Sequence, residues 1–131
     1  DPALLVTERV CAWGVHIDPI NGKYILFKDL DPAGPGSNCS GASKSYTPAS
    51  NEEFQTFVID PSLVISCVGI LPSSCQNAIP VDVLFTPPTP KVSFAPDPAA
   101  SGEGLIIRLE LTDGTRVSDI EVTKGGSVNV N

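Results

Sequence analysis

A hairpin signal between Cys11 and Asp29 constrains this chain more than any other feature. Asn21-Gly22 separates two runs that are rich in β-branched and aromatic residues. Asn-Gly is typical of a two-residue type I′ turn, because both central residues of that turn need a positive φ and these two tolerate it. We therefore predict that the chain opens with an antiparallel pair of strands. Alternation then places three apolar side chains of the first strand on one side and His16 on the less buried side: Trp13, Val15 and Ile17.

The rest of the chain repeats the β pattern. Further strand candidates cover residues 54–60, 63–69, 81–85, 92–95, 105–111, 116–123 and 127–130. Leu63, Ile65 and Cys67 should share one side of their strand. Asp113-Gly114 and Lys124-Gly125-Gly126 indicate tight turns, so the last three strands should form an antiparallel meander. We expect a mainly β fold with antiparallel sheets, as two small sheets or a sandwich.

The length of the chain predicts a single domain that spans residues 1–131. Residues 1–10 could be the end of a helix or a lead into the first strand. Residues 30–51 are rich in Gly, Pro, Ser and Asn and should form a long loop, which is either functional or mobile at that length. The sequence has no Met, so we expect that the chain was processed or trimmed before Asp1. It has no run of 18 apolar residues that would span a membrane.

The four cysteines favour disulfides over zinc. Cys11, Cys39, Cys67 and Cys75 contain no C-x-x-C pair, and the single His cannot complete a Cys₂His₂ site. Pro-Ser-Ser between Cys67 and Cys75 suits a tight return, which favours that pair and leaves Cys11 with Cys39, although the sequence allows three connectivities. Disulfides would place the domain in an oxidising compartment.

The long loop is a candidate interaction surface because exposed loops carry much of protein recognition. Its candidate contact residues are Asp31, Asn38, Lys44 and Tyr46. Asp29, Asp31 and Asn38 also supply oxygen atoms that could bind Ca²⁺. The EF-hand spacing is absent, however, and a solvated loop is the favoured interpretation. We expect neither a cofactor nor a metal.

No catalytic constellation is visible in the sequence. His16 would need an orienting carboxylate and a nucleophile nearby in space, and no Ser lies in a G-x-S-x-G setting. Trp13, Tyr24 and Tyr46 could line a sugar site, but core packing is the favoured interpretation of these aromatic residues. A net charge of −7 disfavours nucleic acid as a partner. We predict a protein that is not an enzyme.

The chain resembles the globular domain of bacterial type IV pilin-like proteins, and especially minor pilins and the H-type pseudopilins of type II secretion. Their domains often begin with a Gly-Val-His-Phe strand and continue, after a turn, with Tyr-x-Leu-Phe-x-Asp. The chain matches this pattern at residues 14–17 and 24–29, with Ile17 in place of Phe. Three later segments fit the same family: an acidic residue before a strand at 52–54, a strand that ends in Phe before prolines at 83–88, and a closing Ile-x-Val, Gly and short strand at 120–130.

This resemblance implies assembly as the function. The family carries a long apolar N-terminal helix that anchors the subunit and packs into the filament core; it is absent here or reduced to a remnant in residues 1–10. Other pilin or pseudopilin subunits would be the partners, the membrane would be reached only through that helix, and the location would be the cell surface, the periplasm or an extracellular filament. His16 and Trp13 would lie in or near the core, and the 31–51 and 67–75 segments would make subunit contacts or act in adhesion. A secreted β-sandwich module that binds carbohydrate or protein is the alternative.

Overall fold

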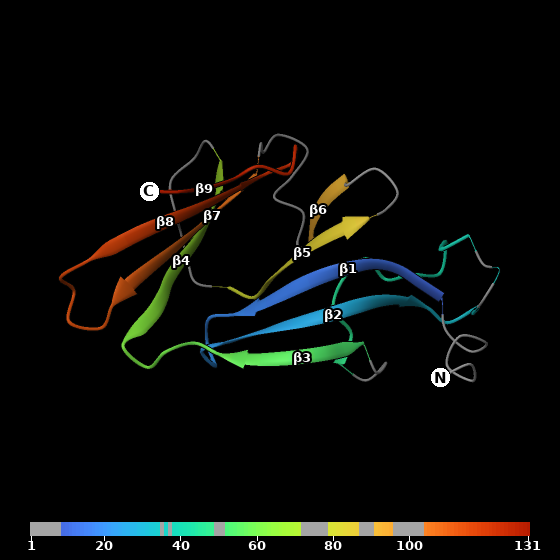
Figure 1. Cartoon of the computed structure of the whole chain (residues 1–131), viewed down its shortest axis with the longest axis horizontal. Coiled ribbons are helices and arrows are strands. Elements are labelled where there is room, and N and C mark those ends of the chain that lie inside the picture. The colour runs from blue at the N-terminus through green and yellow to red at the C-terminus, as the bar shows by residue number, and fades with distance from the viewer. Residues whose placement is uncertain are drawn as a thin grey trace.

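A computed structural model describes residues 9–34, 36, 38–48, 52–71, 79–86, 91–95 and 104–131. The regular structure of the described part is β-strand, and the strands form two antiparallel sheets (Figure 1). Its nine strands are β1 (Arg9–Asp18), β2 (Lys23–Asp31), β3 (Glu53–Val58), β4 (Leu63–Leu71), β5 (Val81–Thr86), β6 (Lys91–Ala95), β7 (Gly104–Leu111), β8 (Val117–Thr123) and β9 (Val128–Val130). The predicted mainly β fold is confirmed.

The two sheets pack face to face as a sandwich. The larger sheet has the order β3-β2-β1-β5-β6, and the smaller one has the order β4-β7-β8-β9. One cluster of buried apolar residues joins them, with Val83 and Phe94 from the larger sheet and Val68, Leu105 and Ile107 among those from the smaller sheet. The predicted meander is β7-β8-β9, and Leu105, Ile107 and Leu109 point toward the core as their alternation predicts.

The first hairpin is confirmed, but its turn is not a two-residue type I′ turn. Asp18 pairs with Lys23, so four residues form the loop, and only Gly22 among them has a positive φ, of 62°. Pro19 suits the first inner position of a type I turn. The Asp18 carboxylate then accepts hydrogen bonds from the backbone N–H and the side-chain amide of Asn21, at 3.1 and 2.7 Å.

β-bulges change the face of the sheet toward which the two strand cysteines, Cys11 and Cys67, point. The β1–β2 register shifts between Val10 and Ala12, which leaves Cys11 in the bulge. A second shift, between Ile65 and Cys67 of β4, pairs Cys67 with Arg108 on the face turned away from the core. The prediction that Cys67 shares a side with Leu63 and Ile65 is therefore wrong, because the extra residue of a bulge reverses the alternation beyond it.

The predicted lead-in at residues 1–10 is described only from Arg9, where β1 begins, and residues 1–8 lie outside the described part. The predicted loop is bounded by β2, which continues to Asp31, and by β3, which begins at Glu53. No helix within the described ranges is long and apolar enough to cross a membrane.

Candidate functional site

The larger sheet has two faces with opposite surroundings. We call the face that carries His16, Phe27 and Leu84 the outer face, and the face that carries Val15 and Val83 the inner face, which is turned toward the smaller sheet. The described residues between β2 and β3 (32–34, 36, 38–48 and 52) form what we call the covering loop, which lies over the outer face; its trace passes behind β1 and β2 in Figure 1.

A disulfide fixes the covering loop to the edge of the outer face. Cys11 in the β1 bulge is bonded to Cys39, with 5.7 Å between their Cα atoms. Cys39 has a φ of 66°, a left-handed conformation that non-glycine residues seldom adopt. The predicted Cys11–Cys39 pair is confirmed, and a disulfide of this kind is typical of a domain outside the reducing cytosol.

Buried carboxylates hold the loop down along its length. Glu52 is only 2% exposed, and its two oxygens accept the backbone N–H groups of Leu30, at 3.0 Å, and Thr47, at 2.8 Å. Asp29 accepts the backbone N–H of Lys44 at 3.1 Å and the Ser43 hydroxyl at 3.3 Å. Burial raises the pKa of both carboxyl groups, although these hydrogen bonds work in the opposite direction.

His16 belongs to the same arrangement. Its Nδ1 is hydrogen-bonded to Asp82 Oδ1, while Asp82 Oδ2 accepts the backbone N–H of Tyr46 at 2.7 Å. The Tyr46 ring lies 4.8 Å from the His16 ring and 5.3 Å from the Phe27 ring. Asp82 is the orienting carboxylate that catalysis would require, but here the pair anchors the loop through Tyr46. The sequence alternation placed His16 on a less buried face, which is wrong: the covering loop buries Phe27 (0% exposed) and Leu84 beside it.

The predicted contact residues of the loop separate into two groups. Asn38 and Lys44 are exposed, whereas Asp31 is buried and Tyr46 is half-buried between the loop and the sheet. Asp31 Oδ1 accepts the backbone N–H of Ala33 at 2.9 Å. Only Asn38 and Lys44 are thus placed to meet a partner, and they do so from a loop that is fixed to the sheet.

Two of the three residues considered for Ca²⁺, Asp29 and Asn38, have hydrogen-bond partners within the domain. Asp29 binds Ser43 and Lys44, and the Asn38 side chain accepts the backbone N–H of Ser40 at 3.0 Å. Within the described ranges, no group of three His, Cys, Asp or Glu residues is arranged to hold a metal ion.

Cys67 is also disulfide-bonded. Its predicted partner, Cys75, lies outside the described residues, as do residues 72–74 before it. Cys67 itself is buried in β4 and faces away from the larger sheet because of the bulge before it.

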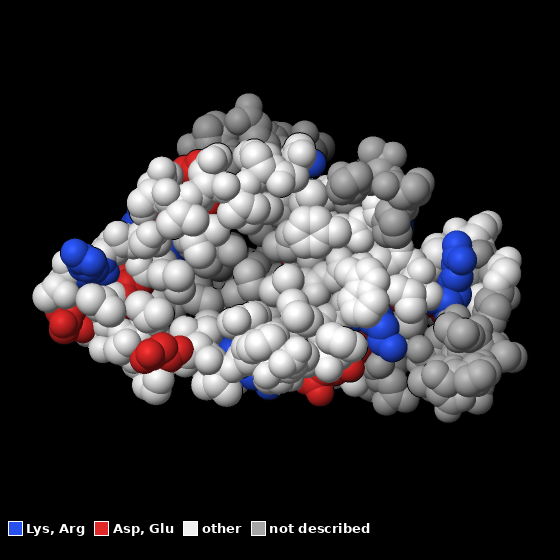
Figure 2. All heavy atoms as spheres, viewed as in Figure 1, with Lys and Arg blue, Asp and Glu red and all other residues white. Residues whose placement is uncertain are grey.

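The inner face, in contrast, is incompletely covered. The two sheets leave an apolar cleft of about 490 Å³ between them, lined by 15 side chains that come from β1 to β5 and β7 to β9 and from the β3–β4 connection. Its floor is the shared core, because Val83, Ile107 and Val122 belong to both. Figure 2 shows this hollow in the middle of one face, surrounded by uncharged side chains, with charged groups nearer the rim. We call this space the cleft.

An aromatic group extends the apolar surface beyond the cleft. Phe85, which lines the cleft and is 39% exposed, pairs across the sheet with Trp13, which is 45% exposed. The Trp13 and Phe54 rings make a T-shaped contact with their centroids 5.5 Å apart, and Phe54 is 61% exposed. The expectation of a core position for Trp13 is therefore wrong. Trp13 is also on the opposite face from Tyr46, and Tyr24 stacks on Phe57, so the three aromatic residues considered for a sugar site do not share one.

The cleft was not foreseen from the sequence. Alternation correctly groups Val15 with Ile17 on one face of β1, but it does not reveal how far the facing sheet covers them. An exposed apolar surface that continues into a cleft is typical of a site that receives another molecule or segment. Comparisons with protein-family models, curated proteins and solved structures find no significant match to this chain. The fold and the site thus define a disulfide-bonded β-sandwich with an open apolar cleft.

Proposed function

We propose that this domain is a structural subunit of a type IV pilus or type II secretion filament, a minor pilin or pseudopilin that acts by assembly and surface presentation. The observation that carries the proposal is the apolar cleft, considered together with the pilin-like pattern of the strands. Subunits of that family combine a β domain with a long apolar helix, and the cleft is a surface that such a helix would cover.

The walls of the cleft favour a helix over an extended peptide. Val15, Val83 and Ile107 all project from strands whose backbone groups are paired within their own sheets. An extended peptide placed between these faces would bury backbone N–H and C=O groups without partners, which costs about 1–3 kcal/mol for each group. An α-helix satisfies its backbone internally and presents only side chains, so an apolar helix suits the cleft.

The outer face supports the presentation part of the proposal. The disulfide and the buried carboxylates hold the covering loop in one arrangement, from which Asn38 and Lys44 project into solvent. A fixed loop loses little conformational entropy when it binds a neighbouring subunit or a surface ligand. The location proposed is accordingly the cell surface, the periplasm or an extracellular filament.

Incorporation into filaments tests this function. In the full-length gene product, Leu109→Arg would place a charge in the cleft. Val64→Arg makes the same type of change at an exposed position on the opposite face of the smaller sheet. We expect wild type and Val64→Arg in sheared surface filaments, and at least a tenfold loss of Leu109→Arg from that fraction. Immunoblots of filament and cell fractions, normalised to total protein, provide the measurement.

A secreted binding module is the second candidate, and the exposed Trp13, Phe54 and Phe85 favour it because aromatic faces stack on sugars and dominate many protein interfaces. Release of the wild-type protein as a soluble monomer, with filaments that lack it, would contradict the filament proposal. Saturable glycan binding that Trp13→Ala abolishes would then identify the module.

A further inference from the structure

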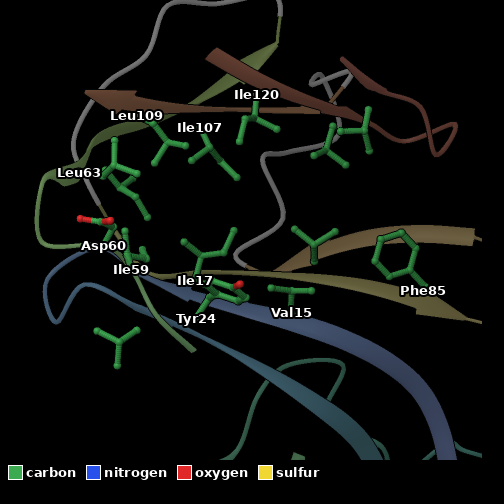
Figure 3. A pocket seen from close by; sticks show the side chains of 15 residues that line it. Val15, Ile17, Tyr24, Ile59, Asp60, Leu63, Phe85, Ile107, Leu109 and Ile120 are labelled. Atoms are coloured by element: carbon green, nitrogen blue, oxygen red, sulfur yellow. The ribbon is translucent and has the colours of Figure 1, made fainter. Parts of the chain in front are cut away.

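The two ends of the cleft differ in chemistry. Asp60 and Leu63, in and just after the β3–β4 connection, lie at one end, and Phe85 of β5 lies at the other (Figure 3). Among the described side chains that line the cleft, Asp60 alone carries a charge. Beyond Phe85 the surface continues as the Trp13–Phe54 pair. The cleft is therefore acidic at one end and aromatic at the other.

Asp60 is held in place as an ionised group. Its Oδ1 accepts the backbone N–H and the hydroxyl of Ser62, at 2.9 and 2.8 Å. These two bonds lower the pKa of Asp60, with no contribution from a neighbouring charge. Arg116 lines a separate pocket beyond Leu63 and Leu109, and within the described residues it makes no ion pair with Asp60. Among the described residues, no ion pair thus neutralises the negative charge at this end of the cleft.

We propose that the occupant of the cleft is an apolar helix that carries a Lys or Arg at one end, and that this cation lies against Asp60. The proposal rests on the proposed function, since it specifies the helix that the cleft receives. Asp60, which is exposed at this end, supplies a charge that a cation on the helix complements, and the uncharged walls exclude further charges along its length. The opposite end of the helix then contacts Phe85 and Trp13, which fixes the direction in which the helix enters.

Synthetic helices of matched composition test this proposal on the purified domain. Two peptides of Leu, Ala and Gln have the same sequence except at one end, where one carries Lys and the other carries Glu. Titration calorimetry gives their affinities. The fluorescence of Trp13, the single Trp of the chain, reports whether the aromatic end is covered. We expect the Lys peptide to bind about fivefold more tightly than the Glu peptide, the upper end of the effect that one exposed ion pair such as that with Asp60 supplies.

Asp60→Asn should remove this preference and bring the affinity ratio close to one. Asp113→Asn is a matched control, because Asp113 accepts the same pair of bonds from Thr115 in the exposed β7–β8 turn; it should leave the fivefold ratio intact. Leu109→Arg should weaken both peptides at least tenfold, and Val64→Arg should change neither. High salt should bring the ratio of the two peptide affinities for wild type closer to one, because salt screens the ion pair.

The outcomes separate this inference from the proposed function. Equal affinity of the two peptides for wild type would overturn the role of Asp60 and leave the filament proposal in place. If neither peptide binds, the helical occupant is wrong, while filament incorporation of Leu109→Arg decides the function independently. A concentration-dependent dimer that Leu109→Arg abolishes would instead identify a second copy of this chain as the occupant.

Discussion

The two faces of the larger sheet are covered in different ways. The covering loop, which has no β-strand, covers the outer face. A disulfide and buried carboxylates hold it there. The inner face is covered by a second sheet that contacts only part of it and leaves the cleft. Polar contacts thus hold a loop over the centre of one face, and apolar packing leaves the other face open to a further segment.

The backbone of the covering loop explains this difference. A loop without regular structure leaves N–H groups that need acceptors when they are buried. Glu52, Asp29 and Asp82 provide those acceptors from within the sheet or next to it. The inner face offers no such groups at its centre, so only elements that satisfy their own backbone can cover it.

The first prediction compares one Phe from each face. Phe27→Ala should lower the free energy of unfolding by about 4 kcal/mol, because the ring is fully buried under the covering loop and its loss leaves a cavity. Phe85→Ala should cost about 1 kcal/mol or less, because Phe85 is already partly in water. Urea unfolding of both variants measures the difference. Equal losses would mean that the inner face is as fully covered as the outer one.

The second prediction concerns the disulfide that ties the covering loop to β1. Cys11→Ala combined with Cys39→Ala should destabilise the domain by about 3 kcal/mol, because the disulfide closes a loop with a sequence separation of 28. Thermal unfolding measures the loss, with Ser40→Ala as the control at an exposed neighbouring position. Peptide binding in the cleft should be unchanged. A double variant as stable as wild type would show that the carboxylates alone hold the loop.

The third prediction concerns the buried charge of Glu52. Because burial raises its pKa in the folded state, the folded protein binds this proton more tightly than the unfolded chain does, for which a Glu pKa is about 4.3. The contribution of Glu52 to stability should therefore increase as the pH falls from 7 through the raised pKa toward about 4.3. Urea midpoints at several pH values, compared between wild type and Glu52→Gln, isolate this contribution.

At pH 7, Glu52→Gln should cost about 1 kcal/mol, because an amide nitrogen cannot accept one of the two backbone N–H groups that Glu52 binds. Glu53→Gln, at the exposed neighbouring position, is the control. A pH dependence of Glu52→Gln that matches that of wild type would show that Glu52 does not titrate differently in the folded state.

The structure gives a physical reason for part of the Gly-Val-His pattern. A Cβ atom on Gly14 would lie 2.5 Å from the Phe27 ring, so only glycine leaves room for that buried ring against β1. His16, two residues later, meets Asp82 and the Tyr46 ring on the same face. Gly14 and His16 both lie on the outer face under the covering loop, and Val15 between them lines the cleft on the inner face. The motif that suggests the family therefore also describes how the two faces differ.

Local patterns in the sequence determined the strands, the three tight connections and the residues that share a face, because alternation and turn chemistry act over a few residues. The bulges, which reversed Cys67, leave no comparable local signal. Only the tertiary structure decided that the loop covers His16, that acidic residues far apart in the chain bind its backbone, and that the sheets leave a cleft. Each of these depends on how distant segments pack, which no local periodicity encodes.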